Sequence, residues 1–258
     1  MTGVAVHYRC LDGGLPPRRI VVPRSGWAGE PQLRVDGSAA QPWHCAPFSE
    51  GASYGLELLY PFQTACEVTL EDGRPKFHGD FAAERASSVV WPPFQSAHPG
   101  HYSIATLLDV RMPDGMAIRV EPHPSFFTDN SGSVPAAVIG NIQTAWWPLC
   151  LFVTFKSPHV GQIHVFEHGR PYCQIVPVAD RAPMTLFPMS PAESAERELL
   201  AQSIMRSRNE IASRTWISHD RLRFDDVYKR LRRAYLAGGL EEVHRQLVEA
   251  LVRGRGKA

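Results

Sequence analysis

Long apolar runs are missing from this sequence. It contains no stretch of about 18 apolar residues, the length that a helix needs to cross a bilayer. Residues 1–10 lack the charged and apolar regions of a signal peptide. Cysteine motifs are missing as well, because the five cysteines are an odd number and form no C-x-x-C pair. These absences argue against a membrane span and a disulfide framework, and they predict a cytoplasmic protein with reduced thiols.

A large net charge is also missing. The 27 Lys and Arg residues nearly balance the 26 Asp and Glu residues, so a net charge of +1 gives no overall attraction to nucleic acid. Positive charge is concentrated only in residues 221–258, which hold ten Lys and Arg against five Asp and Glu, with the cluster K-R-L-R-R at 229–233. This cluster indicates either a contact with nucleic acid or an acidic partner, or a solvated helix face. No aromatic side chains interleave with it, so the solvated face is favoured and nucleic acid is not an expected partner.

Proline, in contrast, is abundant. Nearly all of the 22 prolines precede residue 192, which predicts short strands separated by rigid turns. The sequence Asp72-Gly73 predicts a hairpin, and Pro113-Asp114-Gly115 predicts a turn between two strands. We expect strands at residues 4–9, 19–22, 54–61, 65–70, 87–91, 103–110, 116–120, 148–156, 161–166 and 172–178.

The pattern changes at Ser190. Ser190-Pro191-Ala192-Glu193 forms a capping box with proline at the first helical position, and it predicts a helix of about 20 residues. A second helix is expected from about residue 224 to Gly238-Gly239, and a third over residues 240–252. The sequence therefore predicts a β-rich core domain with a turn-rich N-terminal coat at 1–189, and a helical appendage at 190–258. The expected fold class is mainly β with C-terminal α-helices, α+β overall.

The order of features in residues 101–178 resembles a known superfamily. A strand, the turn P-D-G at 113–115, a strand, the step V-I-G at 138–140, a strand and then G-R-P-Y-C-Q-I at 169–175 are similar to the trimeric dUTPase and dCTP deaminase superfamily. The resemblance implies its β-clip fold, in which subunits often share a site, so a homo-oligomer is plausible. Its chemistry does not carry over. Residues 121–125, E-P-H-P-S, replace the phosphate motif, and Gly140 stands where the catalytic aspartate would follow V-I.

A second resemblance spans about 120 residues. Members of an uncharacterised bacterial family carry H-G-W-E-I-L-x-P, then T-D-W-x-P-F, then F-E-x-G-E-P-F-C. This chain has Y-G-L-E-L-L-Y-P at 54–61, T-A-W-W-P-L at 144–149 and F-E-H-G-R-P-Y-C at 166–173. It departs from the family where leucine replaces the tryptophan after Gly55, and where Arg170 replaces a glutamate. Membership of this family implies a fold but says little about catalytic activity.

Alternating polar residues give the best candidate site. Arg119, Glu121 and His123 share one face of a strand, as do Asn141 and Gln143 in the next segment. In a β-clip fold the corresponding segments line the ligand cleft, so the resemblance implies one pocket around these groups. The alternative is the outward polar face of a half-solvated sheet.

Roles follow from the chemistry of the side chains. Arg119 could hold a carboxylate, Trp146 could stack on an aromatic ring, and His123 or Glu121 could move a proton. Asn141, Gln143 and Glu57 are further candidates for substrate binding. Glu84 is a third candidate for catalysis if desolvation raises its pKa, although a glutamate next to an arginine is commonly a solvated pair.

An iron site is the alternative cofactor prediction. His78-Gly79-Asp80 has the H-x-D spacing of an Fe(II) facial triad, and His159 or His164 could supply the distal ligand. A 2-oxoacid would then be the cosubstrate. Such a short motif arises readily by chance, so the main prediction is a protein without a metal or other cofactor.

The sequence leaves three functions open. The first is an enzyme of specialised metabolism that uses acid–base residues on a small carboxylate-bearing, possibly aromatic, substrate. A condensation or cyclisation of the Pictet–Spengler type fits it, because binding and one proton shuttle supply most of what such a reaction needs. The second is an Fe(II)- and 2-oxoacid-dependent oxygenase. The third is a non-catalytic binding module that docks a partner through its basic C-terminal helices.

Overall fold

The computed structural model describes residues 4–23, 27, 32–33, 35–37, 39–40, 45–81, 92–129, 131–181, 184–217 and 221–255. The chain divides into two compact units. One, which we call the β unit, comprises residues 1–29 and 47–183, and the other, the helical unit, comprises residues 30–46 and 184–258. The fold is mainly β with C-terminal helices, so the predicted α+β class is confirmed. No helix in the described part of the chain is both long enough and apolar enough to cross a membrane.

The β unit is built from short antiparallel strands. They are β1 (His7–Cys10), β2 (Arg18–Arg19), β5 (Leu56–Leu59), β6 (Cys66–Glu71), β7 (Arg74–His78), β8 (Phe94–His98), β9 (His101–Ala105), β10 (Leu108–Arg111), β11 (Met116–Pro122), β12 (Gly140–Ile142), β13 (Phe152–Lys156), β14 (His164–Phe166) and β15 (Pro171–Ala179). Two short helices join them, α1 (Ala46–Tyr54), whose first residue belongs to the helical unit, and the 3-10 helix η2 (Pro124–Thr128).

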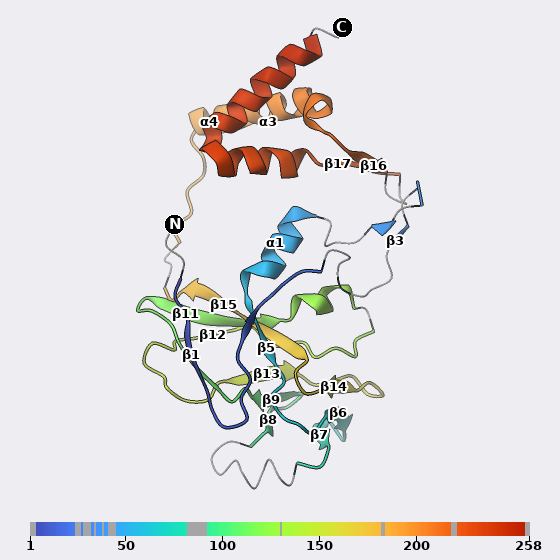
Figure 1. Ribbon diagram of the computed structural model, residues 1–258, viewed down its shortest axis with the longest axis vertical. Coiled ribbons are helices and arrows are strands. Elements are labelled where there is room, and N and C mark those ends of the chain that lie inside the picture. Colours follow the sequence, from blue (N-terminus) through green and yellow to red (C-terminus); the bar gives the residue numbers. More distant parts are fainter. Residues whose placement is uncertain are drawn as a thin grey trace. The chain divides into compact units, whose positions relative to one another are not determined.

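The largest sheet has the strand order β12-β11-β15-β5-β2. Successive side chains of a strand point to opposite faces, so each strand of this sheet contributes to two surfaces. On one face Ile118, Val120 and Ile175 are buried in an apolar core rich in tyrosine and phenylalanine. The opposite face is mixed, with Arg119, Glu121 and Gln174 next to Ala117 and Val176. Figure 1 shows this sheet between α1 on one side and β9, β13, β6 and β14 on the other.

Smaller sheets complete the core of the β unit. They are β13-β9-β8, β14-β6-β7 and the pair β1-β10. The large aromatic side chains that are fully buried among them are Tyr60, Tyr102, Phe155, Phe166 and Tyr172.

Turn chemistry explains where the chain reverses. The predicted β6–β7 hairpin is confirmed, because Asp72 and Gly73 adopt φ of 50° and 72° between these strands. The prediction of one strand over residues 103–110 is wrong. The chain ends β9 at Ala105 and begins β10 at Leu108, with Leu107 at φ 53°, so two different sheets receive the two parts. The Thr106 hydroxyl donates to Leu151 O and accepts from Leu108 N–H, which fixes this break.

One further region differs from the sequence expectation, and another lies outside the described residues. Residues up to 50 are expected to belong to the turn-rich coat and Tyr54 to begin a strand, but residues 46–54 form α1, in which only Ala52 is buried. A helix with so small an apolar face leaves no periodic signal in the sequence. The strand expected at 87–91 lies outside the described residues.

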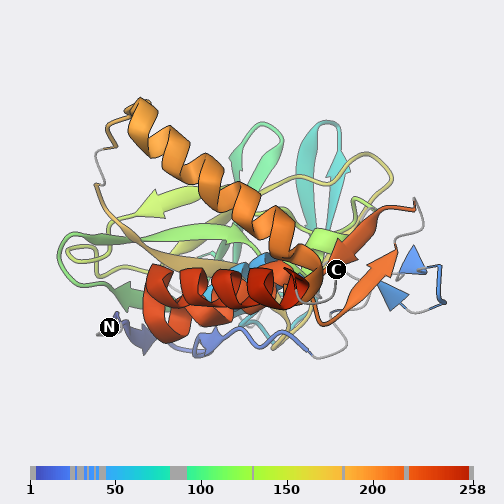
Figure 2. The same ribbon diagram turned by 90° about the horizontal axis from the view of Figure 1, so that it is seen from above.

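The helical unit contains α3 (Pro191–Ile211) and α4 (Val227–Arg255), with the short pairs β3 (Gln32–Leu33) and β4 (Ala39–Ala40), and β16 (Thr215–Ile217) and β17 (Arg223–Asp225). The predicted capping box is present, because Glu193 N–H donates to Ser190 Oγ at 3.2 Å and Ser190 N–H donates to Glu193 Oε2 at 2.8 Å. Gly238 and Gly239 are not helical, with φ of −154° and 67°, so α4 consists of two halves. Figure 2 shows α3 running obliquely across both halves.

Candidate functional site

Polar side chains form a continuous row across the five-stranded sheet. Glu121 of β11 lies opposite Gln174 of β15, Gln174 lies opposite Glu57 of β5, and Glu57 lies opposite Arg18 of β2. Directly opposed residues of antiparallel strands point to the same face. We call Arg18, Glu57, Gln174 and Glu121 the polar row. It occupies the face of the sheet that does not pack on the aromatic core.

Glu57 is the most strongly held member of the row. One of its oxygens, Oε1, accepts from Arg18 Nε at 2.9 Å and lies 2.7 Å from Arg18 Nη2. Its other oxygen, Oε2, lies 3.1 Å from His123 Nε2. The Glu57 side chain is 12% exposed, so these partners replace most of its hydration. A carboxylate is therefore fixed at the centre of the sheet face by an arginine and a histidine.

His123 reaches this carboxylate from the end of β11, where it also caps η2. Ser125 N–H donates to His123 Nδ1 at 3.2 Å, and Ser125 Oγ lies 2.6 Å from the same nitrogen. A backbone N–H can only donate, so Nδ1 is the unprotonated nitrogen and Nε2 donates to Glu57. Trp27 and Phe126 pack edge-on against the ring at 5.7 and 5.8 Å between centroids. His123 is therefore fixed in one tautomer.

Burial decides the charge of this imidazole. His123 is only 2% exposed. Burial lowers its pKa below the ordinary value, while the hydrogen bond and the charge of Glu57 act in the opposite direction. The ring is therefore uncharged at neutral pH and orients the Glu57 carboxylate as a hydrogen-bond donor. Both ring nitrogens are occupied, so His123 positions Glu57 and does not itself face a ligand.

Glu121, two strands away on β11, is held in a similar way. Its Oε1 accepts from Arg119 Nε at 2.6 Å, and its Oε2 accepts from Gln174 Nε2 at 3.0 Å. The other amide atom, Gln174 Oε1, is buried without a hydrogen-bond partner. A Cβ on Gly55 would lie 2.5 Å from that oxygen, so Gly55 provides the room that Gln174 occupies. Every oxygen of the two carboxylates thus has a partner within the protein, but Glu57 Oε2 and both oxygens of Glu121 have one partner each and keep a second acceptor position.

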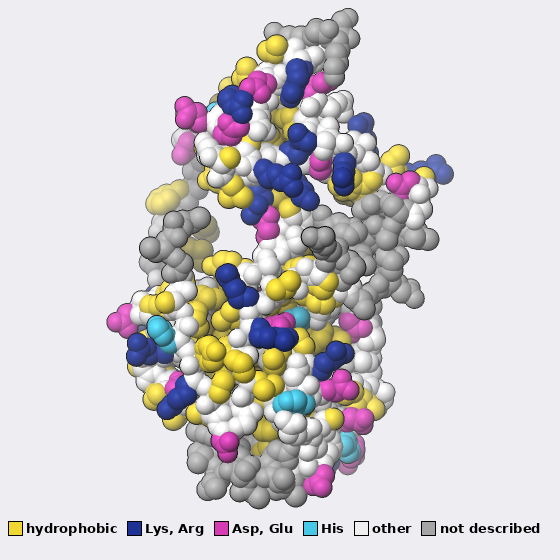
Figure 3. All heavy atoms as spheres, in the orientation of Figure 1, with side chains coloured by type: hydrophobic (Ala, Val, Ile, Leu, Met, Phe, Trp, Pro, Cys, Tyr) yellow, Lys and Arg dark blue, Asp and Glu magenta, His cyan; other side chains and the backbone are white. Residues whose placement is uncertain are grey.

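The guanidinium groups are the accessible part of the site. The Arg18 and Arg119 side chains are 55% and 42% exposed, and each uses only part of its five N–H groups. Figure 3 shows a mostly apolar face of the β unit on which basic, acidic and histidine side chains meet. Arg119 is not part of the row, but with it two arginines balance the two glutamates, so the row and Arg119 together carry no net charge when His123 is neutral. A group of side chains without net charge can bind a ligand carboxylate through its arginines without a general electrostatic attraction for anions.

The structure brings together four of the residues predicted for the site. Glu57, Arg119, Glu121 and His123 lie on one face of the sheet, as two hydrogen-bonded pairs, Glu57 with His123 and Arg119 with Glu121. Asn141 of β12 lies directly opposite Arg119 and is exposed. Glu84 lies outside the described residues.

Gln143 and Trp146 do not belong to this cluster. Gln143 Nε2 donates to Asp180 Oδ1 at 2.6 Å, and Trp146 Nε1 donates to Gln143 Oε1 at 3.3 Å. Asp180 is the first residue after β15 and lies six residues beyond Gln174 in the sequence. Six residues of extended chain span about 20 Å. The indole of Trp146 thus has its hydrogen-bond partner outside the polar row, and its stacking on a ligand stays a prediction.

Sequence reasoning missed Arg18, Ser125 and Gln174. Arg18 joins the site only because β2 pairs with β5, which no local pattern indicates. Ser125 lies in a short 3-10 helix that was not expected. Gln174 left a signal, since it is one polar residue in the apolar run Y-C-Q-I-V of a buried strand.

The histidines of the iron prediction lie on different faces of one sheet. His78 lies opposite Glu67 in the β6–β7 pair, whereas His164 lies opposite the neighbouring Val68 in the β14–β6 pair. Neighbouring residues of β6 point to opposite faces, so His78 and His164 cannot ligate the same ion. Within the described residues no group of three or more His, Cys, Asp or Glu side chains has an arrangement suited to a metal.

The basic cluster at 229–233 lies in the first half of α4. Leu231 is buried there, while Lys229, Arg230 and Arg233 are exposed. This is the arrangement of an amphipathic helix with a solvated basic face.

No protein-family model matches the chain, and no curated protein matches its sequence. Among solved structures it is similar to the dUTPase from phage phi11 of S. aureus, with 10% identity, a TM-score of 0.39, and coverage of 72% of this chain and 97% of that chain. The dUTPase of Staphylococcus bacteriophage 80alpha gives 10% identity, a TM-score of 0.38 and the same coverage, 72% and 97%. At such TM-scores the similarity carries no argument about chemistry. Membership of the uncharacterised bacterial family stays a prediction.

Proposed function

We propose that this chain is an enzyme that acts by acid–base chemistry on a small substrate carrying a carboxylate. The observation that supports the proposal is the hydrogen-bonded series Ser125–His123–Glu57–Arg18. A buried neutral histidine that orients a carboxylate is a common way to hold an acid–base group in one position. Glu57 is the proton-transfer group in this proposal, and His123 is its positioning residue.

The charge of the row defines the substrate class further. Arg18 and Arg119 offer unused N–H groups to a carboxylate, and bidentate binding by arginine gives both affinity and orientation. Because two glutamates balance these arginines, the row suits a substrate with a carboxylate and an amine better than a dianion. A condensation or cyclisation of the Pictet–Spengler type uses such an amine and needs one group to move a proton. Trp27, beside His123, takes the place of Trp146 as the candidate to contact an aromatic part of the substrate.

Ligand-induced thermal shift tests the proposal. The purified protein is screened with aromatic and aliphatic amino acids, with the corresponding amines that lack the carboxylate, and with 2-oxoacids. We expect stabilisation by a carboxylate-bearing amine, and loss of most of that stabilisation in Arg119→Ala and Glu57→Gln. The matched controls are Arg74→Ala and Glu67→Gln, because both residues are exposed on the β6–β7 hairpin. Equal shifts in wild type, Arg119→Ala and Glu57→Gln would contradict the proposal.

A further inference from the structure

Arg119 and Glu121 form a pair of opposite charges on β11. They are two residues apart and point to the same face of the strand, and Arg119 Nε donates to Glu121 Oε1 at 2.6 Å. Asn141 of β12 lies directly opposite Arg119, so its amide group is on this face as well. We call Arg119, Glu121 and Asn141 the β11–β12 cluster. It adjoins the polar row and shares Glu121 with it.

The β11–β12 cluster keeps donors and acceptors that the described part of the chain does not use. Arg119 donates through Nε, and the N–H groups of its two terminal nitrogens have no hydrogen-bond partner among the described residues. Each oxygen of Glu121 has one partner and keeps a second acceptor position. The Asn141 side chain is exposed. The cluster therefore offers a cation, an anion and an amide to a ligand.

The Arg18–Glu57 pair on the other side of the row is more closed. Glu57 Oε1 accepts from Arg18 Nε at 2.9 Å and lies 2.7 Å from Arg18 Nη2, so two nitrogens of the arginine meet one oxygen. The Glu57 side chain is 12% exposed, whereas that of Glu121 is 23% exposed. Glu121 is therefore the more open of the two carboxylates to a ligand group.

Glu121 is also fixed before a ligand arrives. Gln174, which is 6% exposed, donates from Nε2 to Glu121 Oε2 at 3.0 Å, while Arg119 holds the other oxygen. The carboxylate is thus held on two sides, so a ligand spends little binding free energy on ordering it.

An α-amino acid matches this arrangement of charges. Its ammonium and carboxylate groups are bonded to one carbon, so its two charges lie close together, as those of Arg119 and Glu121 do. The terminal nitrogens of an arginine bind a carboxylate in a bidentate manner, and a carboxylate with a spare acceptor position binds an ammonium. A ligand whose two charged groups are far apart can engage only one of these two residues.

We propose that the β11–β12 cluster binds the α-amino-acid head group of the substrate. Arg119 binds the carboxylate, Glu121 binds the ammonium, and the Asn141 amide hydrogen-bonds to the head group. The inference rests on the proposed function, because it names the substrate class of the same site.

The position of Glu57 agrees with such a substrate. His123 lies two residues beyond Glu121 on the same face of β11, which is about 7 Å along the strand. Glu57 Oε2 lies 3.1 Å from His123 Nε2, so the Glu57 carboxylate reaches toward β11. A side chain of ordinary length that extends from the head group along β11 therefore reaches the proposed proton-transfer group.

Calorimetric titration with matched ligands tests each part of the head group. The amino acids L-tryptophan and L-phenylalanine carry both charged groups. The amines tryptamine and phenethylamine lack the carboxylate, and the acids indole-3-propionate and 3-phenylpropionate lack the ammonium. We expect each amino acid to bind more tightly than the amine and the acid derived from it.

Substitutions in the cluster separate the two charged groups of the ligand. Glu121→Gln should weaken binding of the amino acids about tenfold without weakening the acids, because the acids carry no ammonium. Arg119→Gln should weaken the amino acids and the acids about tenfold and leave the amines nearly unaffected. Asn141→Ala should weaken the amino acids by a smaller factor. Far-ultraviolet circular dichroism checks that each variant is folded.

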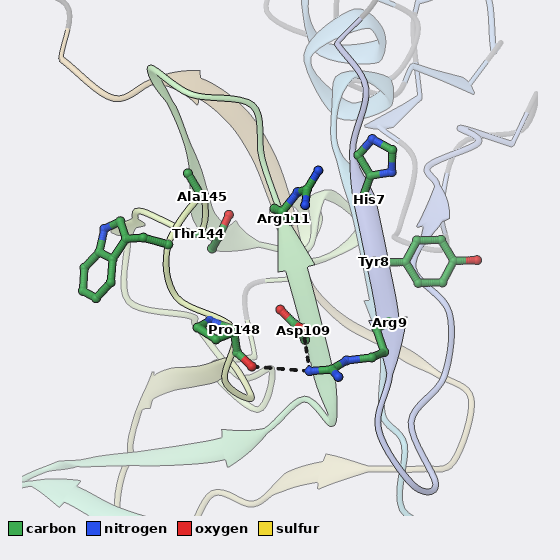
Figure 4. Close-up of a pocket in the computed structure, with 9 residues that line it drawn as sticks. His7, Tyr8, Arg9, Asp109, Arg111, Thr144, Ala145 and Pro148 are labelled. Carbon is green, nitrogen blue, oxygen red and sulfur yellow. Dashed lines mark hydrogen bonds and ion pairs between the residues drawn. The ribbon is translucent and has the colours of Figure 1, made fainter.

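The Arg9–Asp109 pair provides matched controls. Arg9 Nη2 lies 2.8 Å from Asp109 Oδ2 and 3.5 Å from Pro148 O, and Figure 4 shows both contacts. This ion pair belongs to the two-stranded β1–β10 sheet and not to the five-stranded sheet. Arg9→Gln and Asp109→Asn therefore break an arginine–carboxylate pair elsewhere in the β unit and should bind all six ligands as wild type does.

Glu57→Gln distinguishes failure of this inference from failure of the proposed function. Under the proposed function it weakens the amino acids whether or not Glu121 recognises the ammonium. If Glu57→Gln binds them like wild type while Glu121→Gln loses them, the role of Glu57 fails and the head-group site remains.

The inference is overturned if the amino acids bind no more tightly than the acids, or if Glu121→Gln weakens both by the same factor. Absence of binding by all six ligands overturns it as well. The thermal-shift screen with other amino acids and with 2-oxoacids then still decides the proposed function.

Discussion

At the scale of single residues, His164 shows what burial does to a titratable group. It is 3% exposed, and its Nδ1 lies 2.8 Å from the Tyr102 hydroxyl. Burial, assisted by the charge of His159, lowers the pKa of His164 from 6.5 to about 4. Burial also raises the pKa of Tyr102, so its hydroxyl keeps its proton and can donate to the neutral imidazole. Protonation of His164 would place an unpaired charge in the core.

This predicts a loss of stability in mild acid. A group whose pKa is lower in the folded state binds fewer protons there than in the unfolded state, so the free energy of unfolding falls as the pH drops. The contribution is complete above pH 6.5 and is lost as the pH falls toward about 4. The corresponding loss is about 3 kcal/mol. His164→Gln keeps an acceptor for Tyr102 but cannot be protonated, so its unfolding free energy should depend less on pH.

Urea denaturation at several pH values between neutral and pH 4 measures the difference. The unfolding free energy of each variant is compared with that of wild type at the same pH. This comparison cancels the contribution of the carboxylates that titrate in the same range. His98→Gln changes an exposed histidine at the end of β8 and should keep the wild-type pH dependence. An identical pH dependence in His164→Gln and wild type would show that this imidazole does not titrate as expected.

Glycine is required at position 55 because the side chain of Gln174 lies directly against it. Its Cα carries no side chain, and an added Cβ would lie 2.5 Å from Gln174 Oε1 and 3.1 Å from Ile175 O. Gly55→Ala should therefore displace Gln174, weaken its hydrogen bond to Glu121 and cost about 1–2 kcal/mol of unfolding free energy. Gly140→Ala is the matched control, because nothing lies within 4 Å of a Cβ there.

A double variant tests the cause of that cost. Gln174→Ala removes the nearer of the two atoms that meet the new Cβ, so Gly55→Ala should cost less in this background than in wild type. Urea denaturation of the four proteins gives the coupling energy. Additive costs would mean that the contact with Gln174 is not what Gly55 relieves.

At the scale of elements, local patterns predicted what depends on neighbouring residues in the chain. The β6–β7 hairpin follows from Asp72-Gly73, and the start of α3 follows from the capping box at Ser190, because both depend on short-range geometry. The division between β9 and β10 could not be predicted, since the segment 103–110 contains no glycine or proline and the break depends on Leu151 from elsewhere in the chain.

The same distinction between local and long-range information applies to the candidate site. The alternation of Arg119, Glu121 and His123 along β11 predicted that they share a face. The partners that complete the site could not be predicted, because Arg18 and Gln174 reach it only through the register of β2, β5 and β15. For Gln143 the same alternation was extended past the end of β12 at Ile142, where it no longer applies.

At the scale of the whole molecule, each unit has its own hydrophobic cluster, and the two clusters share no residue. The cluster of the helical unit consists of Ile211, Val227, Leu231, Ala234, Val243, Leu247 and Ala250. Leu247 is 3% exposed, and Leu247→Ala should cost about 2–4 kcal/mol by opening a cavity. We expect this cost to fall on the helical unit alone, because the packing of the aromatic core of the β unit does not involve it.

Two optical signals separate the units during thermal unfolding of the full chain. Far-ultraviolet circular dichroism follows mainly α3 and α4, and near-ultraviolet circular dichroism follows mainly the β unit, which holds five of the seven tyrosines. Leu247→Ala should lower the midpoint of the first signal and leave most of the second signal unchanged. Val248→Ala, at a neighbouring position that is 60% exposed, should change neither. A common shift of both signals in Leu247→Ala would mean that the units unfold as one cooperative structure, because independent units would transmit no part of the cost.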